Sequence, residues 1–118
     1  MRTNKYVEPS EDQMTDIDIE VTHAPERLRY EARVGGSVVG FAEYILATDL
    51  IVFTHTEVDP AYEGKGVGSA IARFALDDVR DGSERKVMPL CPFIKGWIGN
   101  HREYVALVKR VPPSTAKD

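Results

Sequence analysis

The hydrophobic pattern of this chain changes its period at Asp59-Pro60. Before that point apolar and polar residues alternate, which is the two-residue period of a half-buried strand. From Val67 to Asp81 the apolar residues instead follow helical spacing. A chain of 118 residues is long enough for one domain and too short for two ordinary ones. The first half of the chain is therefore predicted to form β-strands, and the helix that follows is predicted to pack on the resulting sheet.

Four strands are expected before the change of period. Residues 17–21 and 28–34 alternate, and the glycines at 35 and 36 suit a tight hairpin turn into a third strand over 37–46. Residues 50–58, LIVFTHTEV, are rich in β-branched and aromatic side chains and predict a more buried fourth strand. Together these strands form an antiparallel meander.

The second half predicts a helix, a strand and two short helical segments. The helix from Val67 to Asp81 carries Asp78 inside its apolar arc, where a carboxylate needs a partner. Residues 86–90 form a short strand, and Pro92 suits the first position of a helix. Strand, helix and strand over 50–90 demand a parallel crossover. The predicted fold class is α/β, in the mixed α+β sense, with a five-stranded sheet made of an antiparallel meander and one βαβ unit.

Composition bounds the remaining possibilities. Residues 1–16 and 111–118 are polar and patternless, which predicts flexible tails around a single domain over 17–110. The net charge of -4 provides no basic excess for nucleic acid or an acidic membrane. The lone Cys91 cannot form an internal disulfide, and no signal-type segment precedes the domain. We expect a cytoplasmic protein, a monomer or weak dimer, with no nucleic-acid or membrane partner.

The segment EGKGVGS, from Glu63 to Ser69, places glycines between the fourth strand and the helix. Such a loop gathers unpaired N–H groups at the positive end of a helix dipole, which suits a phosphate or pyrophosphate. A turn that merely needs positive φ is the alternative. The P-loop pattern fails because Gly66 follows Lys65, and the spacing does not match the dinucleotide fingerprint.

With HTEV at 55–58 before this loop and PLCPF at 89–93 after it, the chain from about 17 to 110 resembles the GNAT superfamily of N-acetyltransferases, in a minimal subgroup. The superfamily signature for the acetyl-CoA pyrophosphate falls on Glu63, Gly66 and Gly68. The resemblance implies a GNAT-like fold, acetyl-CoA as the donor substrate and an amine as the acceptor, whose identity the sequence leaves open.

The resemblance also implies roles for individual residues. Val58 and its strand neighbours would meet the pantetheine through backbone groups, and the acetyl group would lie between the diverging ends of strands 50–58 and 86–90. The loop amides would hold the pyrophosphate; the residues concerned are Gly64, Lys65, Gly66, Val67, Gly68 and Ser69.

Two features depart from the superfamily pattern. Glu63 replaces the usual Arg or Gln, and its carboxylate is expected to point away from the phosphates. Only THAPER, residues 22–27, separates the first two strands, where GNAT enzymes usually place one or two helices. The acceptor side is therefore expected to be truncated and open.

Cys91 and His55 are the candidate catalytic residues. Cys91 precedes Pro92 at a helix N-terminus, where the helix dipole favours negative charge. It could protonate the leaving sulfur, act as a nucleophile or serve as packing. His55 could be a base or could orient Cys91, and the alternative is a strand histidine satisfied by a backbone carbonyl. By resemblance Tyr104 would lie near the leaving sulfur, although its segment equally suits a core helix face.

The other histidines suggest no metal site. His23 is expected to be solvated at a turn and His101 to end a helix, and neither shares a metal-ligand spacing with Cys91. Trp97, with Phe93 and Ile94, is expected to pack the last helix onto the sheet, and an exposed interface patch is the alternative.

Three functions remain open from the sequence. The first is an acetyl-CoA-dependent N-acetyltransferase acting on an amine. The alternative is a non-catalytic module that binds acetyl-CoA or CoA and signals to a partner. The third is an interaction domain in which the glycines serve only as a turn, and this one predicts no affinity for CoA.

Overall fold

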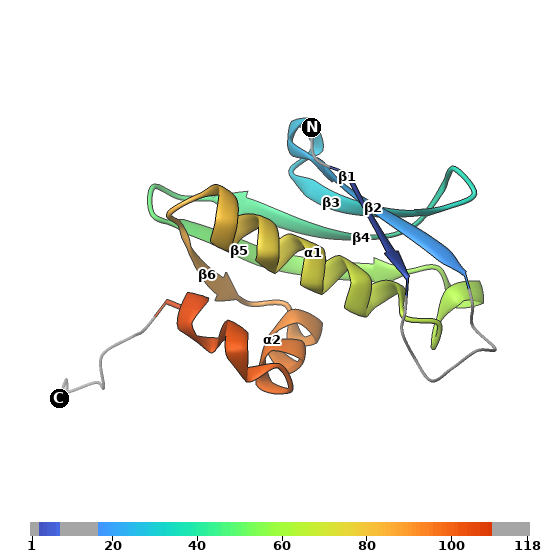
Figure 1. Cartoon of the computed structure of the whole chain (residues 1–118). Helices are drawn as coiled ribbons and strands as arrows, with labels where there is room; N and C mark the ends of the chain where they lie inside the picture. The colour runs from blue at the N-terminus through green and yellow to red at the C-terminus, as the bar shows by residue number, and fades with distance from the viewer. Residues whose placement is uncertain (1–2, 8–16, 110–118) are drawn as a thin grey trace, which may run out of the picture.

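The computed structural model describes residues 3–7 and 17–109, which form a six-stranded sheet in sequence order with helices beside it (Figure 1). Neighbouring strands are antiparallel except β5 and β6, which are parallel. The predicted meander and its parallel crossover are therefore confirmed. The strands are β1 Thr3–Val7, β2 Asp18–Ala24, β3 Arg29–Val34, β4 Ser37–Leu46, β5 Leu50–Val58 and β6 Lys86–Pro89.

Strand β1 corrects the prediction of a tail over 1–16 and of five strands. It pairs with β2 in antiparallel register, from Thr3 opposite Thr22 to Val7 opposite Asp18. An edge strand forms by hydrogen bonds to the free backbone groups of its neighbour. Its side-chain pattern need not show this, and a segment of five residues is too short to show a clear period. The rest of that predicted tail, and the predicted tail over 111–118, lie outside the described residues.

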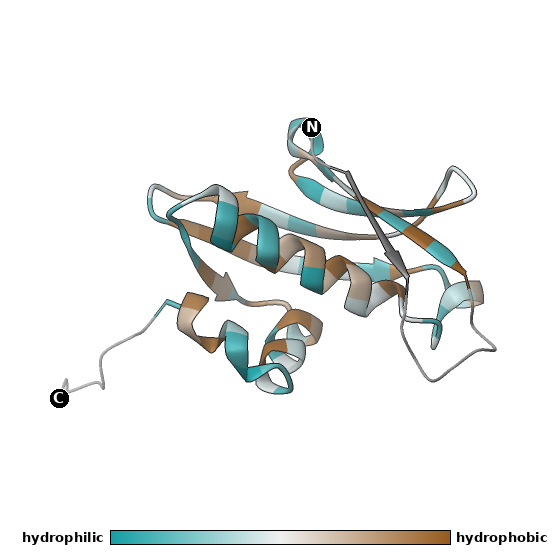
Figure 2. Ribbon diagram, viewed as in Figure 1, coloured by the Kyte–Doolittle hydropathy of each residue, from teal (hydrophilic) through white to brown (hydrophobic). Residues whose placement is uncertain are grey.

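Helix α1, Val67–Gly82, lies across one face of the sheet (Figure 1). It carries both hydrophilic and hydrophobic residues (Figure 2). Its apolar side contributes Ile71, Phe74 and Leu76 to the core. Asp78 lies on the same side and accepts a hydrogen bond of 2.8 Å from the Tyr30 hydroxyl of β3. The partner that this carboxylate requires therefore comes from the sheet.

Helix α2, Pro92–Gly99, begins at Pro92 as predicted, and the 3-10 helix η4, Arg102–Leu107, follows it. Ile94 and Trp97 are buried, while Phe93 is 43% exposed, which differs from the expected packing of all three on the sheet. The Trp97 indole donates a hydrogen bond of 2.9 Å to Ser69 Oγ of α1. Helix α2 is therefore fixed against α1 as well as against the sheet.

The connection between β2 and β3 is a single 3-10 turn, η2, Pro25–Arg27. Leu28, predicted to open the strand, has φ of 55° and is 43% exposed, because it ends the turn in the left-handed region. No α-helix of the described residues lies over the opposite face of β2 to β4 (Figure 1). The expected truncation on this side of the sheet is therefore confirmed.

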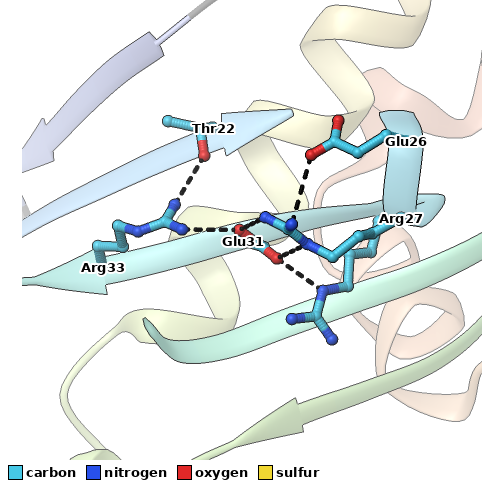
Figure 3. A network of polar contacts seen from close by, with 6 residues as sticks. Thr22, Glu26, Arg27, Glu31 and Arg33 are labelled. Atoms are coloured by element: carbon cyan, nitrogen blue, oxygen red, sulfur yellow. Dashed lines mark hydrogen bonds and ion pairs between the residues drawn. The ribbon is translucent and has the colours of Figure 1, made fainter. Parts of the chain in front are cut away.

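That uncovered face holds a buried carboxylate. Glu31 of β3 is 1% exposed and is surrounded by arginines (Figure 3). It accepts hydrogen bonds from Nε of Arg27 at 2.9 Å, from Nε of Arg29 at 2.8 Å and from Nη2 of Arg33 at 3.0 Å. The hydrogen bond from Arg27 is the largest cause that lowers the pKa of Glu31, to about 2. The ionised carboxylate therefore stabilises the fold and holds three cationic side chains in place.

We predict that Glu31→Gln removes a pH-dependent part of the stability. Because the folded pKa of about 2 lies below the ordinary value of 4.5, the stabilisation is fully present above about pH 4.5 and is lost as the pH falls through about 2. With screening at the partly exposed arginines, it amounts to about 1 to 3 kcal/mol at neutral pH. Urea unfolding of both proteins across this pH range measures it. A difference between the two that stays constant with pH would contradict the assignment.

Candidate functional site

Strands β5 and β6 separate soon after they meet. They pair only from Leu50 with Lys86 to Phe53 with Pro89. The Phe53 carbonyl then accepts two amide hydrogen bonds, from Leu90 at 3.0 Å and from Cys91 at 2.9 Å, where the chain turns away into α2. Beyond Phe53, no strand of the described residues pairs with this edge of β5. That edge can therefore bond an extended ligand as a further strand would.

A cleft of about 450 Å³ lies beside this free edge and reaches the first turn of α1. The rest of its wall comes from the turn before α1 and from α2. Its lining residues are Thr56, Val58, Tyr62, Glu63, Gly64, Gly66, Val67, Gly68, Ser69, Phe93 and Trp97. The cleft therefore joins a strand edge to a helix N-terminus, and an elongated ligand could use both.

The glycine loop leaves backbone donors free at this helix N-terminus. Gly64 and Gly66 have φ of 79° and 89°, in a region that other residues rarely adopt. Gly66 caps α1 without any side-chain hydrogen bond, and the first intrahelical donor is the amide of Ala70. The preceding amides, of residues 67–69, have no hydrogen-bond acceptor among the described residues. The turn therefore needs positive φ, as one alternative from the sequence has it, and it also leaves amides without acceptors at the positive end of the helix dipole.

Gly68 serves a close contact. A Cβ atom at this position would lie 2.8 Å from Cζ of Phe93, so the absent side chain leaves room for that ring over the first turn of α1. Phe93 and Trp97 both line the cleft, although sequence reasoning placed them in the packing of the last helix. No local pattern predicts this contact, because it joins two helices that are brought together only by the fold.

Cys91 lies directly behind the cleft wall. It is 2% exposed and is the N-cap residue of α2. Its Sγ atom lies 3.2 Å from Oγ1 of Thr56, a cleft residue that sequence reasoning missed, and either atom can be the donor. The thiol is therefore shielded from solvent but linked to the cleft by one hydroxyl group.

His55 does not meet Cys91. Neighbouring residues of a strand point to opposite faces, so His55 points away from the cleft that Thr56 lines. Its Nε2 atom lies 3.1 Å from Oε2 of Glu57, and the imidazole is 52% exposed. The hypothesis that His55 orients Cys91 is wrong, because Thr56 holds that position. Val58 lines the cleft.

Tyr104 is not at the cleft either. It is buried, donates a hydrogen bond of 2.6 Å to Asp77 Oδ1 and accepts one of 3.2 Å from Arg73 Nη1. Burial and then the hydrogen bond to Asp77 raise the pKa of Tyr104. Tyr104 therefore lies among the core residues and outside the lining of the cleft.

The two charged residues of the loop occupy different positions. Glu63 is exposed but borders the cleft, so it is not turned away as fully as expected. Lys65 does not line the cleft, and its amide donates a hydrogen bond of 3.3 Å to the Tyr62 carbonyl.

His23 and His101 are held by ring contacts. His23 lies within β2, stacks on Tyr30 with ring centroids 4.3 Å apart and meets the Tyr44 hydroxyl at 2.5 Å, so its expected solvation is wrong. Burial lowers the pKa of His23 more than Asp78 raises it. His101 stacks on Trp97 at 3.7 Å and bonds its carbonyl, which confirms a helix-end position.

Two further findings concern the described residues as a whole. Over 3–7 and 17–109 no group of three or more His, Cys, Asp or Glu could hold a metal ion. Within the same ranges no helix has the length and apolar character needed to cross a membrane.

Comparison with known proteins identifies the family. Residues 29–108 match the model of the GCN5-related N-acetyl-transferase family, so the chain belongs to that family. It is similar to the crystal structure of ribosomal-protein-alanine N-acetyltransferase from Brucella melitensis biovar Abortus 2308, with a TM-score of 0.50 and 21% identity. That match covers 73% of this chain and 66% of the other, and it concerns the fold. No curated protein matches in sequence. The GNAT resemblance and the GNAT-like fold are confirmed.

We predict that Gly66→Ala destabilises the protein by about 1 to 2 kcal/mol, because Ala at φ of 89° brings its Cβ against the backbone. Chemical unfolding measures the change. Gly96→Ala is the control, since nothing lies within 4 Å of a Cβ there and Ala stabilises a helix interior by about 0.5 to 1 kcal/mol. Equal stabilisation by both substitutions would contradict the conformation of the loop.

Proposed function

We propose that this chain is an acetyl-CoA-dependent N-acetyltransferase that transfers an acetyl group to an amine. The observation that carries the proposal is the continuity of the cleft, which joins free amides at the N-terminus of α1 to the unpaired edge of β5. These two features suit an anion and an extended amide chain in one ligand.

The donor set fits acetyl-CoA. The amides of residues 67–69 would hold its pyrophosphate, and backbone groups of β5 between Thr54 and Val58 would bond its pantetheine amides. Each hydrogen bond to a charged group contributes about 1.5 to 3 kcal/mol, so the backbone can bind this anion without the superfamily's Arg or Gln at position 63. Bound acetyl-CoA would supply an acetyl thioester, which we expect near the point where β5 and β6 separate.

The chain's own side chains can move the protons of the reaction. Acetyl transfer forms a nitrogen–carbon bond and breaks a carbon–sulfur bond, so the amine nitrogen loses a proton and the sulfur gains one. The Cys91 thiol can deliver a proton to the cleft through the Thr56 hydroxyl. His55, exposed on the opposite face beside Glu57, can accept one from an amine. Roles of Cys91 as nucleophile or as packing remain alternatives that the following experiment separates.

We predict that calorimetric titration detects acetyl-CoA and CoA binding with a Kd of about 1 µM. Cys91→Ala should retain this affinity but lower turnover by about 10² to 10⁴, the range of acid–base catalysis. Cys91→Ser should recover part of the turnover if the group is a proton donor, because a hydroxyl can also donate. A nucleophile would not be replaced in this way.

Three results would count against these assignments. Absence of binding up to millimolar concentrations would reject the proposed function. Binding of acetyl-CoA without turnover on any amine would favour a non-catalytic module. Unchanged turnover in Cys91→Ala would leave the thiol as packing only.

A further inference from the structure

A second hollow, of about 240 Å³, lies on the uncovered face of the sheet at the end of β5. Phe41 and Glu57 line it, and they face each other across β4 and β5. The Cβ position of Gly40 points at Val67 and Ile71 of α1, so the neighbouring Phe41 points away from the helix. The cleft and this hollow therefore lie on opposite faces of the same strand end.

Arg29 presents a fixed cation to this hollow. Its Nε donates a hydrogen bond of 2.8 Å to the buried Glu31, and its guanidinium lies 4.5 Å from the centroid of the Phe41 ring. No described residue accepts a hydrogen bond from Nη1 or Nη2 of Arg29. Two N–H groups on a guanidinium held in this way are arranged to bind one carboxylate through both oxygens.

Glu57 presents the opposite charge on the other side of Phe41. Its carboxylate is 61% exposed, and its nearest charged partner is His55 Nε2 at 3.1 Å. Asp59 also lines the hollow. The order across the hollow is therefore the Arg29 guanidinium over Phe41, then Glu57, the register partner of Phe41, and then the free edge of β5. Arg29 itself is the register partner of Glu43.

This order excludes simple ligands. A plain anion that met Arg29 would also meet the carboxylates of Glu57 and Asp59, and a plain ammonium ion would meet Arg29. A molecule with a carboxylate at one end and an ammonium group at the other matches both charges.

We propose that this hollow binds an α-amino acid, with its carboxylate on Arg29 and its amino group on the Glu57 side. This inference rests on the proposed function in one respect, that the bound amino acid is the acetyl acceptor. Its nitrogen would then lie beside His55 and towards the strand edge that borders the cleft. The ammonium group gives one proton to His55, the nitrogen loses a second as it bonds the acetyl carbon, and the departing sulfur takes up one, so one proton is released overall.

The test uses the full chain without acetyl-CoA and a matched series of probes. Ligand-detected NMR compares standard amino acids with their carboxamides and with the amines that lack the carboxylate. We predict that the amino acids bind in the millimolar range or tighter and that each matched amide or amine binds at least about tenfold more weakly. Arg29→Met should abolish this difference.

Arg33→Met is the matched control. Arg33 also donates to Glu31 but does not line the hollow, so this substitution weakens the same network and should leave the amino-acid preference intact. An equal loss in both variants, equal binding of amino acids and their amides, or no amino-acid binding would overturn the proposal.

Separate titration with acetyl-CoA distinguishes the two proposals. Acetyl-CoA binding without amino-acid binding overturns the acceptor site alone. Amino-acid binding without acetyl-CoA binding overturns the proposed transferase and leaves the amino-acid site supported. If both bind, Arg29→Met should raise KM for the amino acid about tenfold while kcat is retained, and an unchanged KM would contradict the assignment.

Discussion

The pairing of β5 with β6 ends at the carbonyl of Phe53. The candidate site depends on this separation of the two strands. By accepting hydrogen bonds from both Leu90 and Cys91, this carbonyl turns the chain out of the sheet and into α2. The rest of β5 is left with a free edge, and Cys91 is placed as the cap of α2 behind Thr56. The same turn brings α2 against α1, so that Phe93 closes over Gly68. One acceptor atom thereby organises the strand edge, the thiol and the far wall of the cleft.

A bulge in β5 decides which side chains face the cleft. The register with β4 shifts between Glu43 and Tyr44, where β5 inserts Thr54. An extra residue reverses the alternation beyond it. Without the shift, His55 would share the face of Phe53. With it, Thr56 takes that face, and His55 is presented to the opposite side of the sheet. The bulge therefore directs His55 and Glu57 to the uncovered face of the sheet and Thr56 to the face of the cleft.

Local sequence determines some parts of the fold and of the candidate site, and contacts between distant elements determine the others. Helical spacing identified α1 to within a residue, the hairpin glycines identified β4, and β-branched and aromatic content identified β5. The glycine loop was also predictable from the sequence, because positive φ and free amides at a helix N-terminus are properties of local backbone geometry. The position of Tyr104 was not, because its hydroxyl is directed by Asp77 across two packed elements. The charge order on the uncovered face was hidden as well, since Arg29, Phe41 and Glu57 meet only through strand pairing. Local sequence patterns predict helices and strands. Contacts between side chains of different elements depend on the strand register and the helix packing, which these patterns do not show.

Val58 lines both the cleft and the hollow on the other face, so a single strand end forms the partition between them. A ligand on either side that orders this strand end alters the wall that the other ligand meets. Thermodynamic linkage would make such an influence reciprocal: the factor by which a ligand in the cleft changes affinity in the hollow would equal the factor by which a ligand in the hollow changes affinity in the cleft. Such coupling through one strand end would need no domain movement.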